Sequence, residues 1–214
     1  MKLPVEFYRR ADVVSISRDL LGKVLCTRDG DQLTEAVITE TEAYAGESDK
    51  ASHAWGGRRT KRTEPMYAPG GVAYVYLCYG IHHLFNVVTN VAGTPHAVLV
   101  RAAAPLTGIE VMLERRGKSR PDRTLMAGPG TTSQALGIHT RMTGTDLSGD
   151  RIWLEDRGLS VPASRVRSGP RIGVDYAAED AALPYRFVAA ISDPLEEIGI
   201  RRQESDGGSG PVAV

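Results

Sequence analysis

Residues 70–90 read GGVAYVYLCYGIHHLFNVVTN, the stretch that says most about the fold. Aromatic and β-branched residues, which favour strands, lie on both sides of Tyr79 and Gly80. Gly80 supplies the backbone freedom that a tight turn requires. The pattern predicts a β-hairpin with its tip at Tyr79 and Gly80, where a side chain can project beyond the sheet.

The segments that flank this hairpin predict a mixture of short helices and strands. Further strands are expected over residues 23–27, 33–44, 96–103, 152–155, 171–174 and 185–190. Helices are expected over 11–21 with Gly22 as the stop, over 105–117, and after a glycine-rich turn within 127–138. In the second helix, Thr107 and Glu110 fit a capping box and Gly117 follows the last turn. Hairpin-linked strands mixed with short helices favour the α+β class over a regular βαβ series.

The length and composition predict one folded domain. The chain has 214 residues, enough for a full hydrophobic core without a second domain. We expect the folded domain over residues 1–200 and a polar, glycine-rich, disordered tail over 201–214. No stretch approaches the roughly 18 apolar residues of a membrane span, so we expect a soluble, cytoplasmic protein without a membrane partner.

The sequence offers no pattern typical of a metal or cofactor site. The cysteines, Cys26 and Cys78, lack the paired spacing of a zinc site and are predicted to be reduced and buried. None of the 5 histidines falls in an H-x-x-x-H or H-E-x-x-H arrangement. The glycine turn at 128–130 lacks the G-K-[ST] of a Walker loop. We therefore expect no metal and no cofactor.

Positive charge is concentrated locally although the formal net charge is zero. Neutrality argues against a protein that coats nucleic acid without specificity. The densest cluster comprises Arg58, Arg59, Lys61 and Arg62, and a later one comprises Arg165, Arg167 and Arg171. The first cluster lies in a glycine- and proline-rich loop over 45–70, which is too long for an idle connection in a compact domain. The cluster is either a solvated surface or a loop that binds phosphates.

Two glutamates stand at alternate positions of the strand expected over 33–44. Strand side chains alternate between faces, so Glu40, Glu42 and Tyr44 are expected on the face of Ala36 and Ile38, which begins apolar. A buried carboxylate without partners has a raised pKa, so such a group is either paired or ready to transfer a proton. A structural ion pair at the end of the strand explains the same residues equally simply.

Aromatic side chains lie close to these carboxylates in the sequence. Tyr74 and Tyr76 share one face of their strand, and His53 lies in the loop before them. Core packing alone can explain each ring. A carboxylate with several rings and few cations is nevertheless typical of a site for an extruded nucleobase. The loop at 58–62, and the N-terminal end of the helix after 128–130, would then bind phosphates beside that site.

Blocks of sequence in the same order resemble the alkyladenine DNA glycosylase family, also called the 3-methyladenine DNA glycosylase family. They are ETEAY (40–44), SHAWGGRRTKRT (52–63), GGVAYVYLCYGIHHLFNVV (70–88), VLVRAAAPL (98–106) and GPGTTSQALGI (128–138), within a similarity over about residues 5–192. The resemblance implies a glycosylase domain over 1–200, with a single mixed fold, a curved and largely antiparallel β-sheet, flanking helices and a protruding β-hairpin.

The resemblance also implies base-excision repair. Such enzymes flip alkylated or deaminated purines, among them 3-methyladenine, 7-methylguanine, hypoxanthine and ethenoadenine, out of double-stranded DNA. They hydrolyse the N-glycosidic bond with a water molecule activated by a glutamate and leave an abasic site. We therefore expect duplex DNA with damaged purines as the partner of a monomeric enzyme.

The residue roles follow from the same resemblance. Glu42 would be the general base, with Arg101 beside it. The base pocket would be formed by Tyr44, His53, Tyr76 and Asn86, and Tyr79 would enter the duplex. The expected DNA phosphate ligands are Arg58, Arg59, Thr60, Lys61, Arg62, Met66, Gly130 and Thr131.

The chain departs from the family pattern in one segment, and two other functions are open at this point. Relatives commonly carry a basic residue after the GPG turn, whereas Thr131 and Thr132 follow it here. A glycoside hydrolase could use Glu40 and Glu42 as an acid and base pair, without a need for the basic loop. An inactive DNA-binding relative would lack the carboxylate or the arginine, yet Glu42 and Arg101 are both present.

Overall fold

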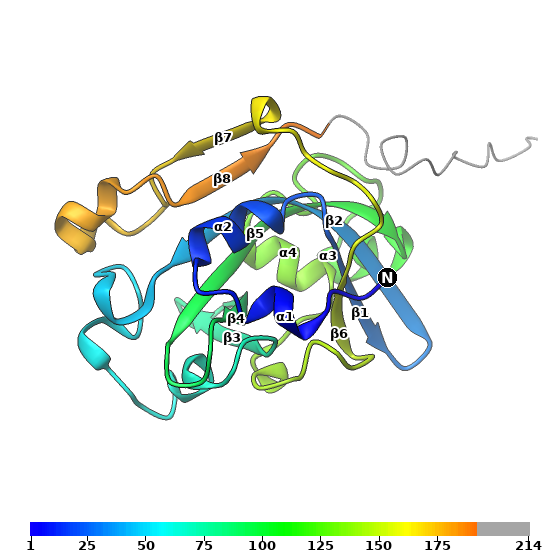
Figure 1. Ribbon diagram of the computed structural model, residues 1–214. Coiled ribbons are helices and arrows are strands. Elements are labelled where there is room, and N and C mark those ends of the chain that lie inside the picture. Colours follow the sequence, from blue (N-terminus) through cyan, green and yellow to red (C-terminus); the bar gives the residue numbers. More distant parts are fainter. Residues whose placement is uncertain (192–214) are drawn as a thin grey trace, which may run out of the picture.

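A computed structural model describes residues 1–191 and shows an eight-stranded sheet in a single mixed α+β domain (Figure 1). The strands are β1 (Val24–Asp29), β2 (Gln32–Tyr44), β3 (Ala73–Cys78), β4 (His82–Thr89), β5 (His96–Thr107), β6 (Ile152–Glu155), β7 (Val166–Gly169) and β8 (Arg186–Ala189). The order is β3-β4-β5-β2-β1-β6, with β8 paired to β2 and β7 paired to β8. Every strand pairing within the described residues is antiparallel, and the sheet curls into a half-barrel, which confirms the expected fold class.

Short helices cover the sheet and turns of 3-10 helix interrupt the loops. The helices are α1 (Val5–Tyr8), α2 (Val13–Asp19), α3 (Ile109–Arg116) and α4 (Pro129–Ala135), and the 3-10 turns are η1 (Gly46–Ser48), η2 (Trp55–Gly57), η3 (Glu64–Tyr67), η4 (Thr140–Met142), η5 (Ala163–Arg165) and η6 (Asp175–Ala182). Helix α2 begins where the Asp12 carboxylate accepts the backbone N–H groups of Val14 and Ser15. Within residues 1–191, no helix has the length and apolar character needed to cross a membrane.

The predicted hairpin is formed by β3 and β4, and its tip is confirmed. Tyr79 and Gly80 both have positive φ, 50° and 74°, and the N–H of Ile81 donates to the carbonyl of Cys78 at 3.2 Å. This backbone conformation matches the twist of the paired strands, and glycine adopts it without strain. The Tyr79 side chain is 91% exposed, so the tip presents an aromatic ring to solvent.

A bulge in β2 overturns the expected facing of its side chains. The register against β5 shifts twice within residues 38–41, so the alternation of faces is interrupted there. Ala36 and Ile38 pack in the main core before the shift, and Ala43 packs there after it. Glu42 and Tyr44 therefore point to the opposite face from Ala36 and Ile38, not to the same face as predicted.

The helix predicted over 105–117 starts later than expected. Strand β5 continues to Thr107, whose hydroxyl donates to the buried Glu35 carboxylate at 2.6 Å, so Thr107 forms no capping box with Glu110. Helix α3 begins after Gly108 at φ 73° and ends at Gly117, as predicted for Gly117. Gly108 is required here, because a Cβ on it would lie 2.3 Å from the carbonyl oxygen of Leu33.

The later part of the chain differs from the prediction in two places. The strand expected over 171–174 is absent from the structure, because this segment packs against the β2 end through Arg171 and forms no ladder. Strand β7 was not predicted; it pairs with β8, which matches the strand expected over 185–190. The tail predicted over 201–214, and the end of the predicted domain, lie outside the described residues.

Candidate active site

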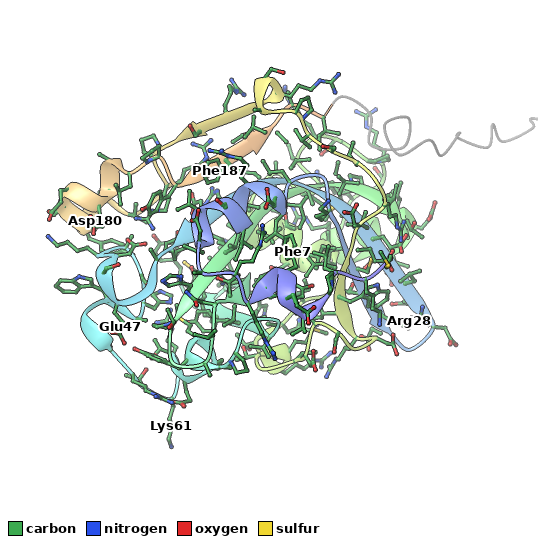
Figure 2. The ribbon with its side chains drawn as sticks, in the orientation of Figure 1. Phe7, Arg28, Glu47, Lys61, Asp180 and Phe187 are labelled. Atoms are coloured by element: carbon green, nitrogen blue, oxygen red, sulfur yellow. The ribbon has the colours of Figure 1, made fainter. Side chains whose placement is uncertain are left out.

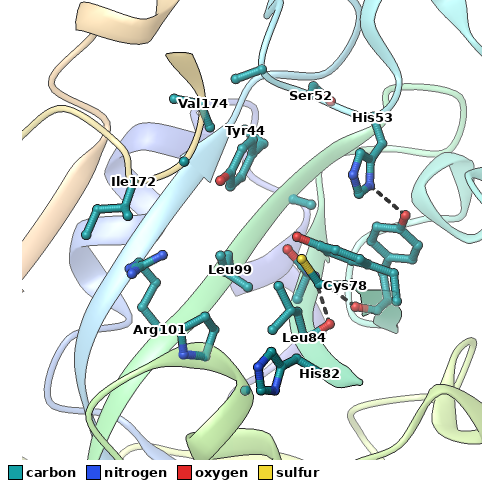
Figure 3. A pocket seen from close by; sticks show the side chains of 18 of the residues that line it. Tyr44, Ser52, His53, Cys78, His82, Leu84, Leu99, Arg101, Ile172 and Val174 are labelled. Carbon is teal, nitrogen blue, oxygen red and sulfur yellow. Dashed lines mark hydrogen bonds between the residues drawn. The ribbon is translucent and has the colours of Figure 1, made fainter. Parts of the chain in front are cut away.

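A cavity of about 420 Å³ opens where β2 and β5 meet the β3–β4 hairpin. The loop after β2 and the segment 172–176 complete its walls. In Figure 3, Tyr44, Arg101 and Ile172 lie on one side, while His53, Cys78 and His82 lie on the other. The walls bring together parts of the chain that are more than 100 residues apart, and most of the rings named from the sequence meet here.

The carboxylate of Glu42 lies behind one wall of this cavity and has no exposed surface. One oxygen accepts the backbone N–H of Ile172 at 2.8 Å and lies 3.5 Å from Nη1 of Arg101. The other oxygen accepts the hydroxyl of Tyr44 at 2.8 Å. All three partners line the cavity, so a small shift of one partner would open the carboxylate to a molecule inside.

Burial raises the pKa of Glu42 above its ordinary value, against the lowering effects of Arg101, the Ile172 N–H and the Tyr44 hydroxyl. Desolvation disfavours the charged form, whereas the neighbouring cation and the donors favour it. Burial and the polar partners thus act in opposite directions on the affinity of Glu42 for a proton, as is typical of a carboxylate that transfers protons. The sequence left open whether such a carboxylate is paired or ready to transfer a proton, and the role of Glu42 as a base stays a prediction.

Arg101 links Glu42 to Glu40, and the two carboxylates have different surroundings. Arg101 Nε donates to Glu40 at 2.9 Å, and Arg186 Nε donates to the same Glu40 oxygen at 2.7 Å. Two guanidinium groups thus engage Glu40, whereas Glu42 is surrounded by the Arg101 guanidinium, a hydroxyl and a backbone N–H. Glu40 is therefore a structural ion-pair residue in this geometry, and the acid and base pair required by the glycoside hydrolase alternative is not supported.

Rings form the wall opposite Glu42. The His53 and Tyr76 rings are 4.6 Å apart, and Nδ1 of His53 lies 2.9 Å from the Tyr74 hydroxyl. Burial, and then the charges of Arg62 and Arg58, lower the pKa of His53 to about 4. His53 is therefore a neutral ring at physiological pH. Tyr74, which the sequence did not assign to the base pocket, also lines the cavity.

Asn86 lies in the wall of the cavity, on β4, with its amide orientation fixed. Its Nδ2 donates to the carbonyls of Tyr74 at 3.1 Å and Leu84 at 3.2 Å. Because both donors are engaged by the backbone, the side chain is held rigidly at the cavity edge. The structure therefore places Asn86 with Tyr44, His53 and Tyr76 around one space, as the resemblance implied.

The hairpin tip stands beside the cavity and is apolar. Tyr79 and His82 both line the cavity, and Ile81 between them is 71% exposed. Ile81 was not singled out from the sequence, although a large apolar residue next to a hairpin turn is a signal for an exposed contact. Cys78, which was expected to be buried, is only half-buried and also lines the cavity.

The basic loop projects from the molecule, with Lys61 at its extremity (Figure 2). Within residues 1–191, Arg58 and Lys61 form no ion pair, whereas Arg59 makes two hydrogen bonds to Glu64 at 2.7 and 2.9 Å. Arg62 lies over the Tyr76 ring, 5.2 Å from its centroid. The four cations therefore differ: two are available to a ligand, one is paired, and one adjoins the base pocket.

Among the other predicted phosphate ligands, Met66 has no free hydrogen-bond donor for a phosphate. Its side chain is buried in the cavity wall, and its N–H already donates to the Thr63 carbonyl at 2.9 Å. The N–H of Thr60 likewise donates to Thr63, which leaves the Thr60 hydroxyl near the surface. The engaged N–H gives no support to a phosphate contact of Met66, which stays a prediction.

Gly130 and Thr131 lie at the start of α4, next to the hairpin. A Cβ on Gly130 would come within 2.9 Å of the His82 ring, so only glycine lets this turn approach β4. The Thr131 hydroxyl bonds the backbone of Gly128 at 2.8 Å, which closes the first turn of the helix. Both residues line the cavity, and their contact with phosphate stays a prediction.

A cluster of possible metal ligands lies away from the cavity. Cys26, Glu35 and Glu155 have ligand atoms within 4.8 Å of one another, and none of these residues lines the cavity. Arg157 forms ion pairs with both carboxylates, and burial raises the pKa of the Cys26 thiol well above its ordinary range. The cluster is thus a thiol and two acids that are already matched by a cation, unlike a set of free metal ligands.

Besides Tyr74 and Ile81, the site residues Arg171, Ile172 and Tyr176 were missed in the sequence. Arg171 belonged to a cluster interpreted as surface charge, yet it is buried and paired with Asp49. Ile172 donates its N–H to Glu42, and Tyr176 lines the cavity mouth. The apolar residues within 171–174 predicted a strand. Only a search for a loop that is anchored to the protein after a strand could have found these residues.

Comparison with known proteins agrees with this arrangement. The model of the family described as Methylpurine-DNA glycosylase (MPG) matches residues 6–193. A protein of Chlamydia felis named "Putative 3-methyladenine DNA glycosylase" is 43% identical over 190 residues, which cover 88% of this chain and 96% of the relative. Relatives with the same name in Chlorobaculum parvum (44% over 191 residues, 88% of each chain) and Bacillus cereus (41% over 196 residues, 87% of this chain and 95% of the relative) are comparably similar.

Together, the fold, the cavity and these matches define an enzyme of the DNA glycosylase class. The chain belongs to the methylpurine-DNA glycosylase family.

Proposed function

We propose that this chain is a monofunctional DNA glycosylase that removes alkylated or deaminated purines from duplex DNA, with water activated by Glu42. The observation that carries the proposal is a buried carboxylate with a raised pKa, held by three residues that line a ring-walled cavity. A flat heterocycle is the ligand that such walls fit best. We expect 3-methyladenine, 7-methylguanine, hypoxanthine and ethenoadenine among the substrates.

The rings explain why damage would be preferred over normal bases. Tyr44, His53 and Tyr76 offer faces for stacking on an extruded purine, and His53 is neutral because its pKa is lowered to about 4. Electron-rich faces attract a cationic purine such as 3-methyladenine or 7-methylguanine more strongly than neutral adenine. A rigid Asn86 at the edge would oppose the exocyclic amine of normal guanine.

The chemistry requires one water molecule and one carboxylate. Glu42 accepts a proton from water while the water oxygen bonds C1′ of the sugar and the N-glycosidic electron pair leaves with the purine. The negative charge of Glu42 also stabilises the oxocarbenium character of the transition state. No lysine lines the cavity within the described residues, which supports direct attack by water over a Schiff-base route.

The exterior of the site supports binding to duplex DNA. Tyr79, exposed at the hairpin tip, can fill the gap left by a flipped nucleotide, and its stacking offsets part of the cost of flipping. Arg58, whose charge acts on His53 in the cavity wall, and Lys61 in the same loop are available to bind phosphates. These features support binding of DNA on the side of the molecule where the cavity opens.

The test is base release from two duplexes, one with a single hypoxanthine and one alkylated, scored by alkaline cleavage at the abasic site. Wild type and Glu42→Gln are compared with Glu40→Gln as the matched control on the same strand. We expect release by wild type, loss of about a thousandfold or more in Glu42→Gln, and retained activity in Glu40→Gln. Release by Glu42→Gln at the wild-type rate would move the base elsewhere, and no release by wild type from either duplex would refute the function.

A further inference from the structure

We propose that Asp49 and Arg171, a buried ion pair outside the cavity lining, are positioning residues that hold Glu42 and Tyr44 in their working geometry. The inference rests on the proposed function, because it assigns these residues a part in base excision. Neither side chain lines the cavity, and both are almost fully buried, at 1% and 0% exposure. Their effect on the reaction would therefore pass through the residues that they contact.

The pair is bidentate, and both terminal nitrogens of Arg171 are engaged. Arg171 Nη1 and Nη2 donate to the two Asp49 oxygens at 2.5 and 2.8 Å. The Asp49 carboxylate also accepts the backbone N–H groups of Ala45 at 2.9 Å and Ala51 at 3.0 Å. A paired carboxylate with this many donors has one stable orientation, so the loop after β2 is fixed at its base.

Arg171 also contacts strand β2, which carries Glu42 and Tyr44. Its Nη1 donates to the carbonyl of Ala43 at 2.8 Å, and Ala43 stands between Glu42 and Tyr44 in β2. Its guanidinium lies 4.8 Å from the centroid of the Tyr44 ring. Arg171 thus supports the strand backbone and the ring that would stack on the base.

The next residue in the chain connects the pair to the general base. Ile172 donates its N–H to Glu42 at 2.8 Å, although the residue is 50% exposed and lies in a segment without regular structure. Such a segment has no ladder to hold its backbone in place. The buried side chain of Arg171 is the anchor that aims this N–H at Glu42.

Two further bonds join the same walls. The N–H of Lys50 donates to the Asp180 carboxylate at 2.8 Å, and the Tyr176 hydroxyl donates to the Ala51 carbonyl at 3.1 Å. In Figure 1 the orange segment that carries η6 lies next to the loop after β2. Asp49 and Arg171 are the buried centre of this connection between two walls of the cavity.

The energetics favour a geometric role over a purely stabilising one. A buried ion pair is a weak source of stability, because desolvation of two charges offsets most of their attraction, and well-packed apolar residues often do as well. A rigid bidentate pair does fix orientation, and small displacements of catalytic groups can cost about a hundredfold in rate. The position of this pair, one residue from a donor to Glu42, is where such rigidity matters.

The test compares Asp49→Asn and the neutral double variant Asp49→Asn/Arg171→Met with wild type. The matched control is Glu35→Gln/Arg157→Met, which neutralises another buried pair anchored on β2 but away from the cavity. The pKa of Glu42 is read by carboxyl ¹³C NMR of the free proteins, assigned with Glu42→Gln. Single-turnover base release, binding to abasic duplex and melting temperature are measured in parallel.

We expect the pKa of Glu42 to rise by about one unit in the double variant, because the Ile172 N–H no longer stabilises its charge. Base release should fall by about tenfold or more while binding to abasic duplex changes by less than about twofold. In Asp49→Asn, the loss of a nearby negative charge by itself would lower the pKa of Glu42. A rise of that pKa in this variant would therefore come from the displaced Ile172 N–H and not from the direct effect of the Asp49 charge. The control should lose stability only.

A Glu42 pKa and a base-release rate that match the control in both variants would overturn the inference. Should the double variant fail to fold, Asp49→Asn alone decides, since it keeps the shape of the side chain and the Arg171 charge. Wild type that releases no base would refute the proposed function instead. The NMR titration would still show in that case whether the pair positions the N–H that contacts Glu42.

Discussion

At the scale of single residues, the site depends on how burial changes the pKa values of two groups, Glu42 behind the cavity wall and His53 in it. Glu42 loses its hydration and keeps three polar partners, so burial raises its pKa while Arg101, the Ile172 N–H and the Tyr44 hydroxyl oppose that rise. His53 loses hydration close to two cations, so its pKa is lowered and its ring is neutral. The same physical cause, burial, thus prepares a base and a stacking surface.

Excision should depend on pH through Glu42. The reaction needs the ionised carboxylate, so the rate should fall as pH drops through a pKa above the ordinary value of 4.5. Arg101→Gln removes the main influence that lowers this pKa, so it should move the acidic limb to higher pH and cost more activity at pH 6 than at pH 8. Single-turnover rates across pH measure this, and an unmoved limb in Arg101→Gln would contradict the assignment.

His53 should make the fold less stable in acid. Its pKa is about 4 in the folded protein against an ordinary 6.5, so the unfolded chain binds the proton more readily between these values. Stability should therefore be fully present above pH 6.5 and be lost progressively as pH falls toward 4. Urea unfolding at pH 7 and pH 5 checks this, because His53→Gln should show a smaller loss between the two pH values than wild type.

At the scale of elements, the β3–β4 hairpin and the bulge of β2 determine which side chains lie at the cavity. The type of turn at Tyr79 and Gly80 aims a ring outward, while the bulge turns Glu42 and Tyr44 away from the core and toward the cavity. Strand β2 also pairs with β5 on one side and with β1 and β8 on the other, so its position is fixed along most of its length. The proposed general base, Glu42, is therefore carried by a strand that is paired along both edges.

If Tyr79 fills the gap in the duplex, Tyr79→Ser should impair excision from duplex DNA by about tenfold or more, since flipping costs a few kcal/mol that the ring helps to offset. Excision from single-stranded DNA should change little, because no stacked partner has to be replaced there. Parallel single-turnover assays on both substrates check this. Equal losses on both would place the Tyr79 ring in the base pocket and not in the duplex.

Two glycines of positive φ should tolerate substitution differently. Gly108→Ala should destabilise by more than about 3 kcal/mol, because a Cβ would clash with the Leu33 carbonyl at 2.3 Å in addition to the strain of the left-handed backbone. Gly117→Ala is the control: it has φ 61° but no atom within 4 Å of a Cβ, so about 1 kcal/mol is expected. Urea denaturation compares them, and equal effects would contradict the steric account.

At the scale of the whole molecule, a neutral chain presents an uneven surface. The basic loop over 58–62 and the exposed hairpin tip stand near one opening, so attraction to DNA is local although the formal net charge is zero. Such a distribution suits a protein that binds duplex DNA through a few phosphate contacts and reads damage through the cavity.

The four cations of the loop should differ in their effect on DNA binding. Arg58→Ala and Lys61→Ala should weaken binding to all duplexes and reduce the slope of log affinity against log salt by about one unit each. Arg59→Ala should reduce the slope by less, because Arg59 is already paired with Glu64. Titrations at several salt concentrations measure the slopes, and equal slopes for all three variants would refute a role that depends on ion pairing.

The sequence by itself determined the elements and the types of residue available for chemistry. Turns, loops and helix ends depend on the conformational preferences of a few neighbouring residues. The hairpin tip, the long basic loop and Gly117 at the helix end could therefore all be predicted. The ordered motifs, including Glu42 and Arg101, likewise indicated the family without a structure.

Only the tertiary structure decided the facing of Glu42, the partners of Glu40 and the burial of Arg171. Each depends on contacts between residues far apart in the chain. The facing of Glu42 depends on a bulge set by pairing with β5, Glu40 is bound by a second guanidinium from β8, and Arg171 is buried against Asp49 of another loop. Strand periodicity assumes an unbroken ladder, and charge patterns assume exposure. Both assumptions fail where distant segments pack together, because burial and pairing energies there outweigh local preference.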